Sequence, residues 1–250
     1  MSTTTASTQA EMQGSGGIPV AARKASFRCA TRLLRSFTLD GPAGRIEAVL
    51  HEGAPDARYA ALVCPPHPLH GGNLHNKVVY HATKALNAPA WGLELPVLRI
   101  NFRGVGRSEG AHDGLAETGD VLAALDWLRC EFGLPLVAVG FSFGAAIVLR
   151  AASQAASTHG DLRALVALGL PTAIAGPAYD YPFLATLFTP KLFLSGDRDA
   201  FGPAGQLAEV AALAAEPRRI ALIPGADHFF TDRLEPMQQQ LAGWLKEHFA

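Results

Sequence analysis

Charged residues are scarce in this chain, and they form no long basic run. They make up 17% of the 250 residues, and the net charge is −1. Binding to nucleic-acid phosphates needs clustered lysines and arginines, so we expect no nucleic-acid partner. Hydrophobic residues make up 49% of the chain, which is enough to build the large core of one α/β domain.

Cysteine is rare as well. Cys29, Cys64 and Cys130 are too few and too scattered for a disulfide framework or a zinc ribbon. A reducing compartment is the simplest interpretation, and we expect a cytoplasmic protein.

Long apolar runs are also absent. No stretch approaches the ~20 residues of a membrane helix, so we expect no membrane partner. The N-terminal region lacks the apolar stretch of a secretory signal. Residues 1–28 are rich in Ser, Thr, Ala and Gly, which predicts a disordered tail before a single domain over 29–250. Three basic residues in this segment leave a transit peptide as the alternative.

Short apolar runs, by contrast, recur along the chain. Two alternating segments around residues 41–44 predict an antiparallel hairpin. Six runs with little polar alternation then predict strands buried on both faces: "YAALVCP", "LPVLRINF", "LPLVAVGF", "LRALVALGL", "PKLFLSG" and "RRIALIPG". Helices are expected between most of them, near 76–87, 115–131, 144–156, 203–215 and 232–247. The pattern predicts an α/β fold with an eight-stranded, mostly parallel sheet and helices on both faces.

The segment 171–190, "PTAIAGPAYDYPFLATLFTP", is proline-rich and shows no helical period. It predicts an irregular loop that is too short for a large cap domain. Its bulky residues, Tyr179, Tyr181 and Phe183, are candidates for the substrate pocket. The alternative is ordinary packing of the loop onto the sheet.

Ser142 stands at a strand-to-helix junction in "LVAVGFSFGAAIVLR" (136–150), with Gly140 and Gly144 two residues away on either side. This G-x-S-x-G pattern is typical of a nucleophile elbow, a sharp turn that exposes a serine hydroxyl above the sheet. The alternative is a buried serine that caps a helix. The position in the middle of the parallel series favours the elbow.

A serine nucleophile needs a base and an acid, which follow it in the order acid, then histidine. His228 comes directly after the last predicted strand, which favours it as the base. Asp197 and Asp199 both follow "KLFLSG". We predict Asp199 as the acid because it lies beyond the turn, whereas Asp197 is better placed to accept from loop amides.

The oxyanion of an acyl-transfer reaction needs two backbone N–H donors. We predict Phe143, the residue after the nucleophile, and Leu69 in the loop "CPPHPLHGGNLHNK", with His70 or Gly71 as alternatives to Leu69.

Two features suggest a metal or a cofactor, but neither fits its motif. The same loop carries clustered histidines, but its prolines and glycines exclude a helical metal site, and no carboxylate lies between His67 and His81. Gly104, Gly106 and Gly110 do not have the dinucleotide-binding spacing. We therefore expect neither a metal nor a cofactor.

Taken together, six segments resemble the α/β-hydrolase superfamily, and within it small bacterial predicted hydrolases with little or no cap: "HPLHGGNLHNKVV" (67–79), "LRINFRGVGRSEG" (98–110), "GFSFGA" (140–145), "DYPFL" (180–184), "SGDRD" (195–199) and "GADHFF" (225–230). The resemblance implies the triad Ser142, Asp199 and His228, an oxyanion hole in the His67-Pro68 loop, and carboxylesterase activity on short acyl esters. The long polar N-terminal segment departs from this group.

The sequence thus predicts a serine hydrolase that cleaves small carboxylic esters through an acyl-enzyme. A thioesterase or acyltransferase with the same triad is the alternative among enzymes. A catalytically silent binding module on this fold is the alternative of another class.

Overall fold

The computed structural model describes residues 33–155 and 161–249. The predicted tail at 1–28 lies outside these residues, and the domain boundary at residue 29 stays a prediction. The described residues belong to one unit. None of their helices is long and apolar enough to cross a membrane.

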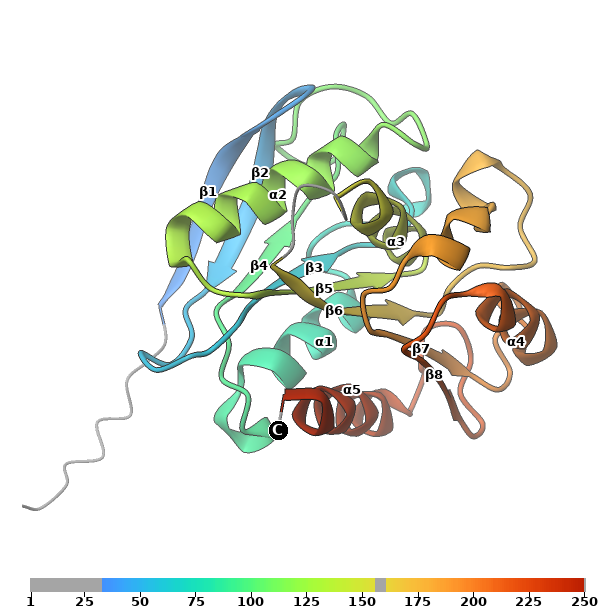
Figure 1. The fold of residues 1–250 in the computed structure, drawn as a ribbon. Helices are drawn as coiled ribbons and strands as arrows, with labels where there is room; N and C mark the ends of the chain where they lie inside the picture. The colour runs from blue at the N-terminus through green and yellow to red at the C-terminus, as the bar shows by residue number, and fades with distance from the viewer. Residues whose placement is uncertain (1–32, 156–160, 250) are drawn as a thin grey trace, which may run out of the picture. The chain divides into compact units, whose positions relative to one another are not determined.

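An eight-stranded sheet forms the centre of the molecule, as the sequence predicted (Figure 1). The strands are β1 (Leu34–Gly41), β2 (Gly44–His51), β3 (Ala60–Cys64), β4 (Val97–Ile100), β5 (Leu136–Phe141), β6 (Leu162–Leu168), β7 (Lys191–Gly196) and β8 (Arg218–Ile223). They are arranged in the order β1-β2-β4-β3-β5-β6-β7-β8. The pairs β1–β2 and β2–β4 are antiparallel, and the remaining pairs are parallel.

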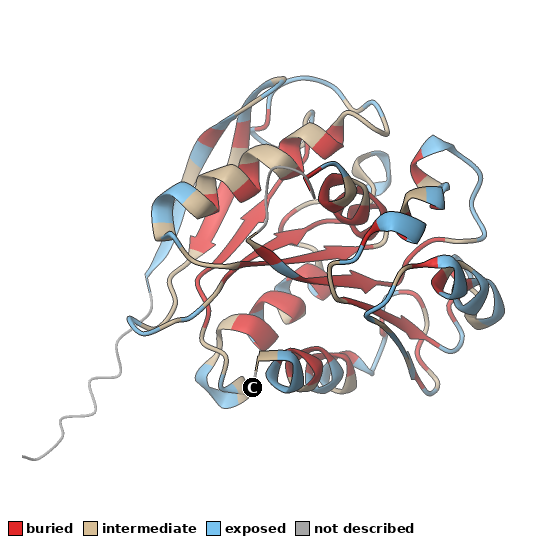
Figure 2. Ribbon diagram, viewed as in Figure 1, coloured by how far each residue is buried: buried red, intermediate tan, exposed pale blue. Residues whose placement is uncertain are grey.

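Helices cover both faces of the sheet. They are α1 (Lys77–Asn87), α2 (Glu117–Phe132), α3 (Phe143–Ala155), α4 (Ala204–Leu213) and α5 (Leu234–Phe249). One apolar core lies between the sheet and α2, α3 and α4, and a second lies between the sheet and α1 and α5. The central strands β3 and β5 are completely buried because both of their faces are covered (Figure 2).

The connection between β6 and β7 contains only two short 3-10 turns, Pro177–Tyr179 and Pro182–Thr186. The predicted absence of a large cap therefore holds for this segment. Since β3, β5, β6, β7 and β8 run parallel, the loops that follow them meet at one edge of the sheet, where ligands bind in such folds.

Candidate active site

Ser142 occupies the turn between β5 and α3. Its φ angle is +56°, in the left-handed region that costs a non-glycine residue ~1–3 kcal/mol. The surrounding backbone holds it there: the Ser142 amide donates to the Leu168 carbonyl at 2.8 Å, and the Ser142 carbonyl accepts from the Ala145 amide at 2.9 Å. These hydrogen bonds hold the strained turn, and with it Ser142, at the carboxyl edge of the sheet.

The two flanking glycines are sterically required. A Cβ on Gly140 would lie 2.2 Å from the Gly144 carbonyl oxygen, and a Cβ on Gly144 would lie 2.4 Å from the Pro65 carbonyl oxygen. No side chain fits at either distance. The close contact between Gly144 and Pro65 also shows that the loop after β3 packs against the first turn of α3, beside Ser142.

His228 and Asp199 reach Ser142 from the loops after β8 and β7. His228 Nε2 lies 2.9 Å from Ser142 Oγ, and His228 Nδ1 lies 2.9 Å from Asp199 Oδ2. A carboxylate only accepts, so Nδ1 carries the proton and Nε2 is left to accept from the serine hydroxyl. The structure thus brings together the three residues that the sequence predicted as a triad.

Asp199 is held by more than His228. Its Oδ1 accepts from the amides of Phe201 at 2.8 Å and Gly202 at 3.0 Å, and its Oδ2 accepts from Ser195 Oγ at 3.0 Å. Burial acts to raise the pKa of Asp199, but the hydrogen bond to His228, the charge of His228 and the two amides outweigh it, and the pKa is lowered. Asp197 is exposed and accepts from the Gly225 amide at 2.7 Å, a loop contact of the kind expected.

The two predicted oxyanion donors differ in the structure. The Phe143 amide begins α3 and donates to no other group within residues 33–155 and 161–249. The Leu69 amide is already engaged, because it donates to His67 Nδ1 at 3.2 Å. Both alternatives are engaged as well: the His70 amide donates to the His67 carbonyl at 3.1 Å, and the Gly71 amide to the Pro68 carbonyl at 3.2 Å.

This corrects the prediction for Leu69. Pro68 begins a tight 3-10 turn over Pro68–His70 that uses the amides of its own residues. In the described part of the chain, the His67 amide, just before the turn, has no such partner. It lies two residues after Pro65, whose carbonyl adjoins Gly144.

A cleft of about 530 Å³ opens above Ser142 and His228. One part of its lining is polar and comes from the loop after β3: His67, His70 and Asn76. The other part is mostly apolar and comes from other loops: Ile174, Ala175, Tyr179, Phe201 and Phe229.

Of the three aromatic residues predicted for the pocket, only Tyr179 lines this cleft. Tyr181 is buried, and its hydroxyl donates to the Pro171 carbonyl at 2.6 Å. Phe183 packs against Arg150, whose guanidinium carbon Cζ lies 4.9 Å from the centroid of the Phe183 ring. For these two residues the prediction was wrong, because their side chains fix the loop to α3 and to its own start. The sequence analysis missed Phe201 and Phe229, although each lies within two residues of a triad member.

Comparison with known proteins places the chain in a family. A family model described as the alpha/beta hydrolase fold matches residues 69–219. The chain belongs to this family. It is 37% identical to an uncharacterized protein of Rickettsia prowazekii over 217 residues, which cover 82% of this chain and 86% of the other.

Solved structures of alpha/beta hydrolases agree with this assignment. The chain is similar to an alpha-beta serine hydrolase homologue from Coxiella burnetii, with 30% identity and a TM-score of 0.75 over 84% of this chain and 97% of the other. It is also similar to a serine hydrolase without a lid from Xanthomonas campestris, with 29% identity and a TM-score of 0.74 over 86% and 94% of the two chains. The fold and these neighbours support a hydrolase.

Proposed function

We propose that this protein is a serine hydrolase that cleaves short-chain carboxylic esters through an acyl-enzyme. Ser142 is the nucleophile, His228 the general base and Asp199 the acid that orients it. The observation that carries the proposal is the unbroken chain of contacts from Asp199 through His228 to Ser142 Oγ, which opens onto a cleft. A helix-capping serine would need no such chain.

The reaction follows from these contacts. His228 Nε2 takes the proton of Ser142 Oγ while Oγ bonds to the ester carbonyl carbon and the carbonyl oxygen becomes an oxyanion. The intermediate collapses, the carbon–alkoxide bond breaks, and the alcohol leaves with the proton from Nε2. Water then attacks the acyl-serine with His228 again as base, which releases the acid and restores Ser142.

The oxyanion would be held by the amides of Phe143 and His67. Both are without another partner in the described part of the chain, and the Gly144–Pro65 approach brings their segments together. His67 takes the place first predicted for Leu69. Fixed amide donors of this kind stabilise charge that develops only in the transition state.

The cleft favours an ester over a coenzyme A thioester, the alternative that the sequence left open. The described residues that line it include no lysine or arginine. A coenzyme A substrate would leave its phosphates without the cationic partners that usually hold such groups.

Acyl-chain length tests the substrate proposal. The small apolar part of the cleft can bury only a few methylenes, each contributing about 0.8 kcal/mol. A longer chain would extend into water and add no transition-state binding. We expect kcat/KM for p-nitrophenyl esters to peak at about two to six acyl carbons and to fall at ten or more.

The assay would compare this ester series with acyl-CoA thioesters of matched length. A preference for the thioesters would favour the thioesterase alternative. An optimum at long chains would contradict the short-chain proposal. Turnover of neither series, together with no reaction with an organophosphonate, would favour the binding module.

A further inference from the structure

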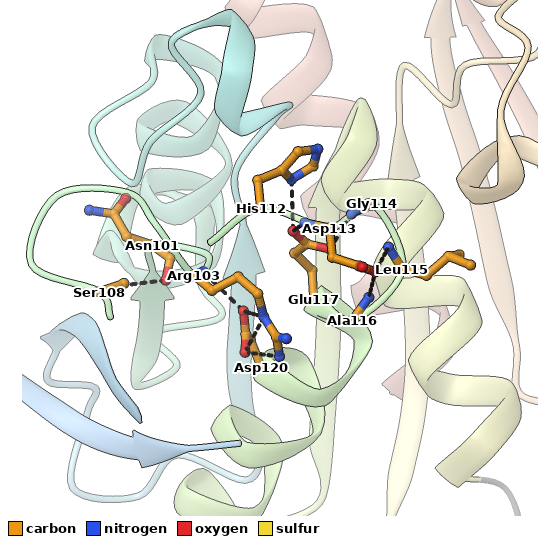
Figure 3. A network of polar contacts seen from close by, with 10 residues as sticks. All are labelled: Asn101, Arg103, Ser108, His112, Asp113, Gly114, Leu115, Ala116, Glu117 and Asp120. Carbon is orange, nitrogen blue, oxygen red and sulfur yellow. Dashed lines mark hydrogen bonds and ion pairs between the residues drawn. The ribbon is translucent and has the colours of Figure 1, made fainter. Parts of the chain in front are cut away.

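A second histidine–carboxylate pair joins the loop between β4 and α2 to the first residue of α2. His112 Nδ1 is 2.7 Å from Glu117 Oε1, and the two side chains are 13% and 0% exposed (Figure 3). His112 Nδ1 makes no hydrogen bond among the described residues, so this is a close polar contact and not a hydrogen bond. The pairing of residue types repeats that of His228 and Asp199, although only the latter two are hydrogen-bonded, and neither His112 nor Glu117 lines the cleft.

Glu117 is a buried carboxylate that forms no salt bridge with a lysine or arginine among the described residues, although Arg103 lies near enough to feel its charge. Its two oxygens accept from the amides of Asp113 and Gly114, each at 2.9 Å. Arg103, near the same helix, is instead paired with Asp120 at 2.7 Å (Figure 3). Burying a carboxylate is costly unless it is well hydrogen-bonded, so a fully buried one calls for an explanation.

Capping at the start of α2 provides part of that explanation, because Asp113 and Glu117 accept from backbone amides reciprocally. Asp113 Oδ1 already accepts from the amides at the start of the helix, Leu115 at 3.2 Å and Ala116 at 2.9 Å. Beyond the amides of residues 113–114, the Glu117 carboxylate lies against the ring of His112, 2.7 Å from Nδ1. The carboxylate therefore fixes where that ring lies.

The ring of His112 packs against the proposed oxyanion donors. Its centroid is 4.7 Å from that of His67 and 5.5 Å from that of Phe143, which it meets edge-on. The rings of His67 and Phe143 are themselves 4.9 Å apart. The three rings form one cluster, and two of them belong to the residues whose amides would bind the oxyanion.

His67 is suited to this cluster as a neutral ring. Its Nδ1 accepts from the Leu69 amide, and this contact requires an unprotonated nitrogen. Burial lowers the pKa of His67, and the neighbouring His112 and His70 lower it further. The 3-10 turn after His67, and with it the direction of the His67 amide, is thereby kept.

We propose that His112, oriented by Glu117, is a positioning residue for the oxyanion hole: its ring fixes the rings of His67 and Phe143, and so the two amides beside Ser142. The inference rests on the proposed function. In this proposal His112 and Glu117, which lie outside the triad, assist the same reaction through packing and do not contact the substrate.

Substitution of His112 should weaken stabilisation of the transition state more than binding of the substrate. A poorly placed oxyanion hole still binds the neutral ester, so KM should change little while kcat falls. Misplacement by about 1 Å can cost ~10²-fold in rate, so we expect His112→Ala to lower kcat roughly 10–100-fold. A purely structural role would lower the fraction of folded enzyme without changing its selectivity.

A thionoester provides the readout that separates the two roles. In it sulfur replaces the carbonyl oxygen, and sulfur is larger and a weaker acceptor, so fixed amides favour the ester. Full-length wild type, His112→Ala and His112→Phe would be assayed on p-nitrophenyl butyrate and its thiono analogue. Thermal unfolding would confirm that each is folded. His81→Ala removes another half-buried histidine, on α1 and paired with Gln238, and is the matched control.

We expect the ratio of ester to thionoester turnover to fall in His112→Ala, and to fall less in His112→Phe, which keeps an aromatic ring but loses the contact with Glu117. His81→Ala should keep the wild-type ratio. A folded His112→Ala enzyme with wild-type kcat and ratio would overturn this inference alone. Absence of Ser142-dependent ester turnover in the wild type would overturn the proposed function, and the inference with it.

Discussion

Replacing Ser142 with alanine should lower kcat for ester hydrolysis by roughly 10³–10⁶ while the protein stays folded. Alanine removes Ser142 Oγ, the proposed nucleophile, which lies 2.9 Å from His228 Nε2. The fold should persist because alanine is smaller and the backbone bonds of residue 142 remain. Steady-state kinetics on p-nitrophenyl butyrate, with circular dichroism as the check on folding, would measure both effects.

Ser142→Gly is the matched control. It should be equally inactive, but glycine adopts the φ angle of +56° without strain and should raise the free energy of unfolding by ~1 kcal/mol or more. If both variants are inactive but differ in stability, the loss of activity comes from the missing hydroxyl and the change in stability comes from the backbone strain. Near-native turnover by either variant would contradict the assignment of Ser142.

The second large effect is expected at Asp199. In Asp199→Asn the amide nitrogen donates toward His228 Nδ1, which forces the imidazole proton onto Nε2. Nε2 then cannot accept from Ser142, and kcat should fall by about 10⁴. The variant should also lose stability, since an amide cannot replace a carboxylate that accepts from His228, Ser195 and two backbone amides.

Asp197→Asn is the control on the same loop. Asparagine Oδ1 can still accept from the Gly225 amide, so we expect a loss in kcat below about 10-fold. Parallel kinetics of the two variants would decide between the two aspartates. A larger loss at Asp197 than at Asp199 would show that the acid has been misassigned.

The sequence alone was enough to predict the sheet, its helices and the meeting of Ser142, Asp199 and His228. The reason is that each of the three residues lies in or just after the turn that follows a parallel strand, and the carboxyl ends of such strands share one edge. The position of β4 between β2 and β3 was not predicted, because the runs "YAALVCP" and "LPVLRINF" carry no signal for their order across the sheet.

Errors arose where the outcome depended on contacts within a loop. Leu69 and Tyr181 both have the residue type and place that their predicted roles require. Local hydrogen bonds decided against them: the Leu69 amide is used within its own 3-10 turn, and the Tyr181 hydroxyl donates to the start of its own loop.

The pair of His112 and Glu117 escaped the sequence analysis for a related reason. The two residues are only five positions apart in "HDGLAE", a spacing that corresponds to no regular face, and Gly114 between them adopts a φ angle of +102°. Their contact depends on that turn, and the contact of His112 with His67 and Phe143 depends on three separate segments. A glutamate five residues after a histidine, at a predicted helix start, was the only signal present.

Covalent trapping of Ser142 tests the central claim most directly. Full-length protein would be incubated with a p-nitrophenyl alkylphosphonate, from which Oγ attack on phosphorus expels p-nitrophenol, and then analysed by intact mass and peptide mapping. The account predicts one phosphonyl group per chain, located on the peptide that contains Ser142, with loss of ester turnover in proportion and no labelling of Ser142→Ala. Full ester turnover without labelling, or with the label on another residue, would contradict it.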